Sequence, residues 1–600
     1  MKFKNLSRWT IDPTLDGLIF CAQRLDELVW DFTLDTHKPL SLNAPYLCQE
    51  ALAVVENVEN ELIDAANLKH VLEELIWSVQ NDPIAKSLLD LPIERYVNTA
   101  DEVKLTDLKR RLSALSKTLE PFRYLTKCFD KLSECVRAVR KKDIDATART
   151  IVTTLINMGM SKKHLQAQIN SYFFSQFGVP IKSADQIDEF LQSIYPYSHD
   201  CDVYFVASDL ILTVRESSRA FGVTVLDELP DDIARLQAET PEFARGRDEC
   251  YVAVSSVRAL DVFSAQEKAA GSLDRLSDLY TLFHHQNKIT WRSTALVKQC
   301  CLPQPVAAAL NNGAMEKPYD FGTDKASKEL NRLIRNFAIR GASKVRFDRV
   351  ADLHGICVSN DVLDNQLVTL WTSLETLIPS TVSTSKIGNV LNQTTPFLMQ
   401  AYIQRLLQRF THDLIIWRKW YVKRLLNRVP GVEGSNTVYR VLALLAIRDN
   451  EPLRAELYTE LKDFHLLRYR AFQLSEILAS PAKVQATLSA HLKKVEWQIR
   501  RIYRTRNMLV HSGKRPSYIR ALVENAHDYF DQIIFDVMRL SCGEYRAESL
   551  DDVFELVKLR HEKFMSTLVS IDRFDVHNCA FLCEDLDTLR DFQNEVWTGA

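Results

Sequence analysis

Hydrophobic residues recur every three or four positions along most of the chain, which is the spacing of an amphipathic helix. Between Asp12 and Gly178 this pattern is almost unbroken, and prolines lie at or between the ends of the periodic stretches. We therefore predict an all-helical N-terminal module over residues 1–178. Its helices are expected at residues 15–30, 44–62, 68–79, 105–119, 122–139 and 144–158.

The pattern changes after residue 178. Short stretches rich in β-branched and aromatic residues, separated by Asp, Ser, Gly or Pro, indicate strands. With helices around residues 186–195 and 263–284, they predict a small α/β or α+β domain over residues 179–300, and residues 301–344 are expected to form a linker and a helix. The expected strands are residues 203–206, 210–214, 221–226 and 250–257, and residues 289–297 are a further candidate.

Residues 345–545 return to the helical pattern and are expected to form a helical bundle, so the fold class is mainly α and multi-domain. The longest helix is expected to begin at the cap Ser480 and end before Gly513. One face of this helix is apolar, but Arg506 interrupts it. A guanidinium on the buried side of a helix is costly unless it is paired or opens onto a cavity. The apolar positions of this face are Val484, Leu488, Leu492, Val495, Ile499, Ile502 and Leu509.

His511 follows Arg506 in the last turn of this helix, where the negative helix end favours an imidazolium. Asn507 and His511 are spaced i, i+4 and share a face, whereas Arg506 lies about 140° around the axis from His511. A histidine, an arginine and an amide without a metal-ligand cluster suit RNA cleavage by attack of the 2′-hydroxyl on the adjacent phosphorus. His511 would then be the general acid or base, Arg506 the clamp on the phosphate, and Asn507 the group that positions phosphate or imidazole.

The motif Arg-Asn-x-x-x-His followed by Ser-Gly, at residues 506–513, resembles the signature of HEPN domains, many of which are metal-independent ribonucleases. The surrounding IYRTRNMLVHSG, downstream of LVTLWTSLETL, is similar to the ApeA-like branch found in prokaryotic defence proteins. The resemblance covers roughly residues 345–540. It implies an HEPN-type endoribonuclease acting as an anti-phage or toxin-like effector.

The resemblance has further implications for partners and for supporting residues. HEPN domains commonly dimerise with two motifs facing each other, so we expect a homodimer through the motif helices. Glu375, on an earlier helix, is expected to orient Arg506 or His511. The N-terminal domains would receive a phage-derived or regulatory trigger. Gly513 stands where systems controlled by a nucleotidyltransferase have Tyr, so adenylylation is not predicted.

Two other interpretations stay open at this point. Arg506 can instead pair with an internal carboxylate such as Glu375 while His511 caps the helix end, which would make the bundle a non-catalytic HEPN-like scaffold or regulatory protein. A metal-dependent hydrolase is disfavoured, because no His-rich or Asp-rich motif accompanies the site.

Charge is unevenly distributed along the chain, although its formal net value is only −3. Between residues 480 and 520 there are ten Lys or Arg residues and one acid, whereas residues 541–600 hold thirteen acids and six bases. Such a basic element would concentrate RNA, unless the acidic C-terminal helical segment, residues 546–600, neutralises it. The residues expected to contact RNA are Arg500, Arg501, Arg504, Lys514 and Arg515.

The 600 residues contain twelve scattered cysteines and no apolar stretch long enough to cross a membrane. Cys300 and Cys301 are the one adjacent pair, and the grouping His577, Cys579 and Cys583 lacks a fourth ligand in a recognised pattern. We therefore expect a cytoplasmic protein with reduced thiols, without metal, cofactor or membrane association.

Overall fold

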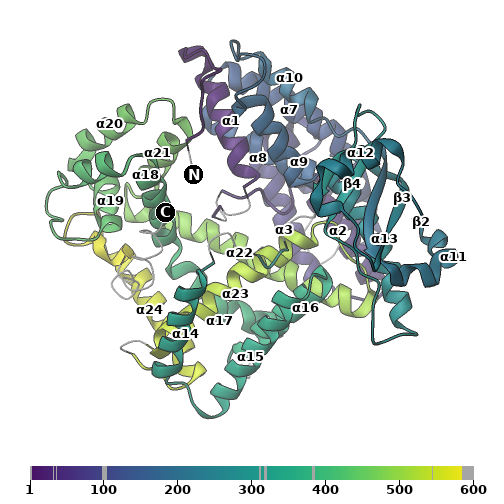
Figure 1. Cartoon of the computed structure of the whole chain (residues 1–600). Coiled ribbons are helices and arrows are strands. Elements are labelled where there is room, and N and C mark those ends of the chain that lie inside the picture. Colours follow the sequence, from purple (N-terminus) through teal and green to yellow (C-terminus); the bar gives the residue numbers. More distant parts are fainter. Residues whose placement is uncertain are drawn as a thin grey trace.

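Figure 1 shows the computed structural model of the chain. The predicted fold class, mainly α with several domains and a small sheet, is confirmed. The structure describes residues 3–30, 33–34, 37–97, 104–309, 313–316, 320–380, 385–542 and 545–583.

The N-terminal module is a set of helices around one apolar core, which we call the N-terminal core. Leu18, Val71, Leu132 and Ile151 are among its buried residues. The helices expected from the sequence all form here, with bounds that differ by a few residues. They are α1 (Asp16–Leu28), α2 (Ala44–Glu59), α3 (Ala66–Asn81), α4 (Pro83–Leu88), α5 (Ile93–Tyr96), α6 (Leu105–Thr118), α7 (Pro121–Arg137), α8 (Lys141–Met158), α9 (Lys162–Ile169) and the π-helical turn η2 (Asn170–Phe174).

The boundary predicted at residue 178 is wrong. Helix α10 (Gln186–Ser193) buries Ile187, Phe190 and Leu191 in the N-terminal core. The helical module therefore continues to the beginning of the first strand. The sequence pattern could not locate this domain boundary, because the periodicity of an amphipathic helix does not indicate which core its apolar face joins.

The sheet domain holds five antiparallel strands in the order β2-β3-β1-β4-β5. Alternate residues of β1 point to opposite faces, as strand geometry requires. Val203 and Phe205 pack with α13 (Val262–Thr281), and Tyr204 and Val206 pack with α12 (Asp231–Glu239). The strands are β1 (His199–Ser208), β2 (Val223–Leu226), β3 (Glu249–Ala259), β4 (Thr294–Gln299) and β5 (Val306–Ala309).

Two of the sequence expectations for this domain need correction. The strand expected at residues 210–214 is the 3-10 helix η3 (Asp209–Val214), whose apolar residue Ile211 is buried in the same core as β1. The domain also extends beyond residue 300, since β5 pairs with β4. The remaining short helices here are α11 (Arg215–Ser218), η4 (Arg219–Phe221) and η5 (Pro241–Phe243).

The C-terminal half is helical and includes the expected long helix, α22 (Pro481–Ser512). The other helices are α14 (Thr323–Asn336), α15 (Gly341–Ser359), α16 (Leu363–Leu377), α17 (Lys386–Gln400), α18 (Tyr402–Leu426), α19 (Thr437–Ala446), η6 (Arg448–Asn450), α20 (Glu451–Glu460), α21 (His465–Ile477), α23 (Ile519–Cys542), α24 (Leu550–Ser570) and η7 (Cys579–Cys583).

This half has two apolar cores, so the single bundle expected at residues 345–545 is not what forms. The motif core includes Trp371, Phe397, Phe530 and Phe554, from α16, α17, α23 and α24. The lateral core includes residues of α18 to α21 and of η7. Helix α24 contributes to both cores, so the C-terminal segment that begins at residue 546 is not a separate unit. Residues 584–600 lie outside the described part.

Helix α22 crosses the middle of the molecule and joins these cores (Figure 1). Val484 and Leu488, near its beginning, belong to the lateral core. Val495, Ile499 and Ile502 belong to the motif core. A third side of the helix faces the N-terminal module.

That third side carries a buried cluster of charges. Arg501 donates to both carboxylate oxygens of Glu50 in α2, at 3.0 and 3.1 Å from Nε, and lies 2.5 Å from Glu74 in α3. Arg504 donates to the same Glu50 carboxylate at 2.9 Å. Glu50, Arg501 and Arg504 are all buried. Buried charges are tolerated only when they are paired in this way, so the cluster ties α22 to the N-terminal module.

Substitution of Glu50 by Ala should lower the free energy of unfolding by about 3 to 5 kcal/mol. The change leaves two buried guanidinium groups without the carboxylate they share. Urea denaturation followed by circular dichroism measures the difference. Glu56→Ala is the matched control, because Glu56 is exposed on the same helix, and it should change the value by roughly 0.5 kcal/mol or less.

The difference in unfolding free energy between wild type and Glu50→Ala should depend on pH. Burial opposes ionisation of Glu50, but Arg501 and Arg504 outweigh it and hold the pKa of its carboxyl below the ordinary 4.5. The stabilisation is therefore fully present at neutral pH and is lost as the pH falls through the lowered pKa. If the difference in unfolding free energy between wild type and Glu50→Ala stayed constant well below that pH, the ion pairing of Glu50 would be contradicted.

Candidate functional site

The C-terminal end of α22 carries the residues singled out from the sequence. Ser480 caps the helix by accepting from the Lys483 N–H, and Pro481 occupies the first turn. At the other end Gly513 has a φ of +63°, a left-handed conformation that glycine adopts readily and that ends the helix. Arg506, Asn507 and His511 thus lie in the last two turns.

Helix α16 packs against this end and runs in the opposite direction. Asp364, in its first turn, lies 3.5 Å from Arg515, which follows α22. Further along α16, the ring of Trp371 is 5.4 Å from that of Tyr503. Trp371 is fully buried and fixes the two helices against each other. This packing brings Glu375, one turn after Trp371, toward α22.

Glu375 and Asn507 hold the Arg506 side chain from two sides. Arg506 Nη1 donates to Asn507 Oδ1 at 3.1 Å, and Nη2 lies 4.0 Å from Glu375 Oε2. The Arg506 side chain is 25% exposed and that of Glu375 is 32% exposed. The structure therefore brings together Glu375 and Arg506 as expected. Arg506 therefore interrupts the apolar face at a partly exposed position, although its Nε is buried.

His511 is exposed, one and a half turns beyond Arg506. Five residues of helix correspond to a rise of about 7.5 Å, and the two side chains leave the helix on different sides. The arrangement can clamp one phosphate oxygen and move one proton, and a second proton-transfer group would have to come from elsewhere.

The residues expected to contact RNA fall into two groups. Arg501 and Arg504 are buried and paired with Glu50, so their assignment as RNA contacts is wrong. Lys514 and Arg515 are exposed beyond the helix end, and Arg500 is half-buried. The sequence showed four arginines close together, but the carboxylates that neutralise two of them come from helices more than 420 residues away.

A hollow of about 450 Å³ lies beside the motif, between α22 and the junction of α15 with α16. Its lining includes Val510, Ile356 and Asp364, but not Arg506 or His511. Val510 is 52% exposed and Ile356 is 48% exposed. Val358 and Val362, which flank the same junction, are also exposed. We call Ile356, Val358, Val362 and Val510 the motif-side patch.

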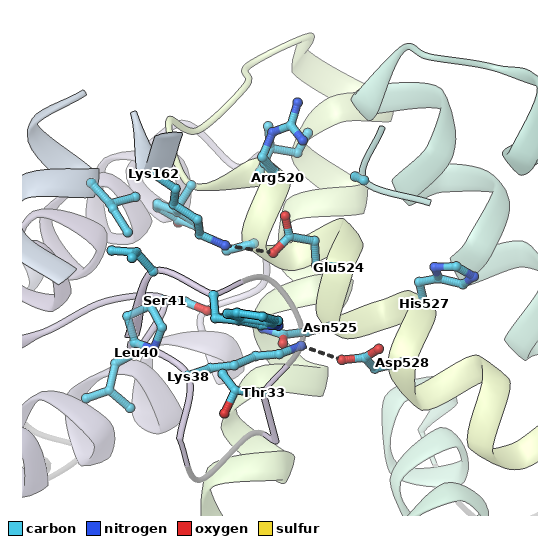
Figure 2. Close-up of a pocket in the computed structure, with 18 of the residues that line it drawn as sticks. Thr33, Lys38, Leu40, Ser41, Lys162, Arg520, Glu524, Asn525, His527 and Asp528 are labelled. Atoms are coloured by element: carbon cyan, nitrogen blue, oxygen red, sulfur yellow. Dashed lines mark hydrogen bonds and ion pairs between the residues drawn. The ribbon is translucent and has the colours of Figure 1, made fainter. Parts of the chain in front are cut away.

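A second cavity, of about 530 Å³, lies where the N-terminal module meets α23 (Figure 2). Two ion pairs cross it, Lys162 to Glu524 at 3.4 Å and Lys38 to Asp528 at 2.6 Å. Its wall also includes Arg515, four residues after His511. The sequence pattern gave no sign of either hollow, because each is assembled from segments far apart in the chain.

Among the described residues, two groups of side chains have the composition and proximity of metal ligands. One group is His199, Cys300 and Cys301 in the sheet domain. The other is His354, His527 and Asp531, where His527 and Asp531 already form a pair at 3.3 Å within one turn of α23. Neither group includes a residue of the motif.

The comparisons with known proteins add no relative. No protein-family model matches this chain, and neither the curated proteins nor the solved structures gave a significant match. Within the part of the chain that the structure describes, no helix combines the length and apolar character needed to cross a membrane.

The two kinds of arginine on α22 should differ in their effect on stability. Arg506→Ala should cost about 1 kcal/mol or less, because the side chain is partly exposed and its ion pair is long. Arg501→Ala should cost about 3 kcal/mol or more, because it leaves buried carboxylates unpaired. Urea denaturation of the two variants, measured side by side, checks the difference. Equal costs would show that Arg506 is also a structural residue.

Proposed function

We propose that this chain is a metal-independent endoribonuclease of HEPN type, acting in the cytoplasm as a prokaryotic anti-phage or toxin-like effector. One observation carries the proposal: Arg506 is held by Asn507 and Glu375, yet its side chain is still 25% exposed at the helix end that also carries the exposed His511. Arg501, which serves structure, is by contrast closed off by the carboxylates of Glu50 and Glu74.

The proposed reaction is an internal transesterification. The 2′-hydroxyl loses its proton and attacks the adjacent phosphorus, the bond to the 5′-oxygen breaks, and that oxygen takes up a proton. Arg506 stabilises the negative charge that grows on the phosphorane oxygens, and Asn507 and Glu375 fix the direction of its guanidinium. His511 carries out one of the two proton transfers. The products are a 2′,3′-cyclic phosphate and a 5′-hydroxyl.

A second copy of the chain would supply the other histidine. The motif-side patch supports this part of the proposal, because two of its exposed apolar residues, Ile356 and Val510, line one hollow, as is typical of a protein interface. The patch includes Val510, which directly precedes His511. A two-fold contact there would bring the two motif ends together, as an isologous interface does.

The N-terminal module is proposed to hold the site under control until a trigger arrives. It contacts α22 along the Glu50 cluster, and the Asn57 amide reaches the Met508 sulfur at 3.2 Å, three residues before His511. The cavity crossed by the Lys38 and Lys162 ion pairs lies between this module and α23. A phage-derived or regulatory ligand entering there would act on the segment that follows the motif.

The rival proposal is a non-catalytic scaffold in which Arg506 pairs with Glu375, and the 4.0 Å contact between them fits it as well. The buried Arg501 and Arg504 also favour it, since these two basic residues of α22 serve structure. Activity measurements separate the two.

Purified protein, triggered where a trigger is known, should cleave RNA in the presence of EDTA and leave 2′,3′-cyclic phosphate and 5′-hydroxyl ends. His511→Ala and Arg506→Ala should each reduce the rate about a hundredfold or more, since one loses a proton transfer and the other the phosphate clamp. Gel electrophoresis and end-group analysis of a labelled RNA provide the measurement.

His285→Ala is the matched control for this experiment, because His285 is an exposed histidine in another domain, and the variant should cleave normally. A substrate with a 2′-deoxy substitution at the cut site should resist cleavage. Products with 5′-phosphates, abolition by EDTA, or full activity in a folded His511→Ala variant would each contradict the mechanism.

Ile356→Asp should convert the proposed dimer to monomers, because a charge on each copy would be buried against its partner. Light scattering at micromolar concentration measures the mass, and RNA cleavage should fall with the loss of the dimer. Val569→Asp is the control, because it places the same charge on an exposed valine of α24. It should leave the dimer mass and the RNA cleavage unchanged. A wild-type chain that stays monomeric with RNA and trigger present would remove the two-histidine mechanism.

A further inference from the structure

The sheet domain brings together two thiols and an imidazole that the proposed ribonuclease site does not use. His199 is the first residue of β1, and Cys300 and Cys301 directly follow β4. In the antiparallel register Cys201 lies opposite Gln299, and the Cys300 N–H donates to the Asp200 carbonyl at 3.0 Å. Continued by two residues, this register places Cys301 opposite His199. The backbone itself therefore makes these three residues neighbours.

The distances are those of a ligand set. Cys301 Sγ is 2.9 Å from His199 Nδ1 and 3.7 Å from Cys300 Sγ, and one ligand atom from each residue lies within 4.8 Å of the other two. With a zinc–sulfur bond of about 2.3 Å, two thiolates of a tetrahedral site are roughly 3.7 to 3.8 Å apart. The two sulfurs already have this separation, and the imidazole needs a movement of only about half an ångström.

The three side chains are also accessible. Cys300 and Cys301 are exposed, whereas nine of the twelve cysteines are buried and Cys542 is intermediate. His199 is half-buried at the end of the sheet. An ion bound there would have three protein ligands and a fourth coordination position facing solvent. Sulfur and nitrogen ligands favour a soft or borderline cation.

We propose that His199, Cys300 and Cys301 bind a thiophilic divalent cation, Zn²⁺ in the first place, where the beginning of β1 meets the end of β4. The bound ion would cross-link β1 to the segment after β4. Its ligands His199 and Cys301 are 102 residues apart in sequence. The proposal is independent of the ribonuclease site and does not involve its chemistry.

The location suggests what such an ion would do. The sheet domain contacts the N-terminal module close to this end, because Ala259 of β3, which pairs with His199, is followed two residues later by Asp261. The Ser161 N–H donates to Asp261, the cap of α13, at 2.9 Å. A cation at the adjacent strand ends would stiffen the sheet where it meets that module.

Cobalt titration of the full-length protein tests the site. The chain is reduced, stripped of metal with EDTA and desalted without oxygen, and Co²⁺ is added. Thiolate-bound cobalt should give a charge-transfer band in the near ultraviolet that saturates at one ion per chain, and Zn²⁺ should abolish the band by displacement. Zinc should also protect Cys300 and Cys301 from iodoacetamide, as peptide mapping by mass spectrometry would show.

The variants decide whether these three residues are the ligands. Cys300→Ser and Cys301→Ser should each remove most of the band, and His199→Ala should weaken cobalt binding by about tenfold or more. Cys542→Ser removes a thiol outside the site and should bind cobalt as the wild type does. Because both cysteines are exposed, circular dichroism should show that the variants stay folded. Absence of the band in the wild type, or an unchanged band after both serine substitutions together, would overturn the proposal.

Discussion

The architecture depends on one buried electrostatic constraint, the sharing of the Glu50 carboxylate by Arg501 and Arg504. Each of these charges would be costly to bury alone, and together they satisfy one another. Because Glu50 lies in α2 and the arginines in α22, the cluster requires the N-terminal module and the last third of the chain to fold against each other.

The constraint also fixes how α22 is rotated about its axis. With Arg501 directed at Glu50, a helix of about 100° per residue places Arg506 roughly 140° further around, on the side where α16 supplies Glu375. Arg504 and His511 lie within about 20° of each other, so His511 continues the side that faces the N-terminal module, just beyond the end of the buried contact. The proposed site thus lies on the part of α22 that follows its buried contact with the N-terminal module.

The Glu50 cluster also changes the interpretation of the basic stretch around the motif as an RNA-binding surface. Ten positive side chains over residues 480–520 suggest a surface made for a polyanion, but two of the arginines are neutralised internally. Among the basic residues that stay exposed, Lys514 and Arg515 lie next to His511, and Arg515 is 3.5 Å from Asp364. A smaller basic surface at the helix end is still suited to hold a phosphate chain at the proposed site.

The sequence by itself determined the local elements of this protein. Helical periodicity, the Ser480 cap and the Gly513 stop located α22, and the spacing of Arg506, Asn507 and His511 on it follows from helix geometry alone. These features depend on neighbouring residues, so a single sequence contains them.

Tertiary structure alone decided which arginines are buried, which core α10 joins, and how two cores share the C-terminal half. It also brought His199 to Cys301, through a strand register that no local pattern encodes. The physical reason is the same in each case: the partner lies in another element of the chain, and the pattern of each element is satisfied equally well by any apolar neighbour or opposite charge.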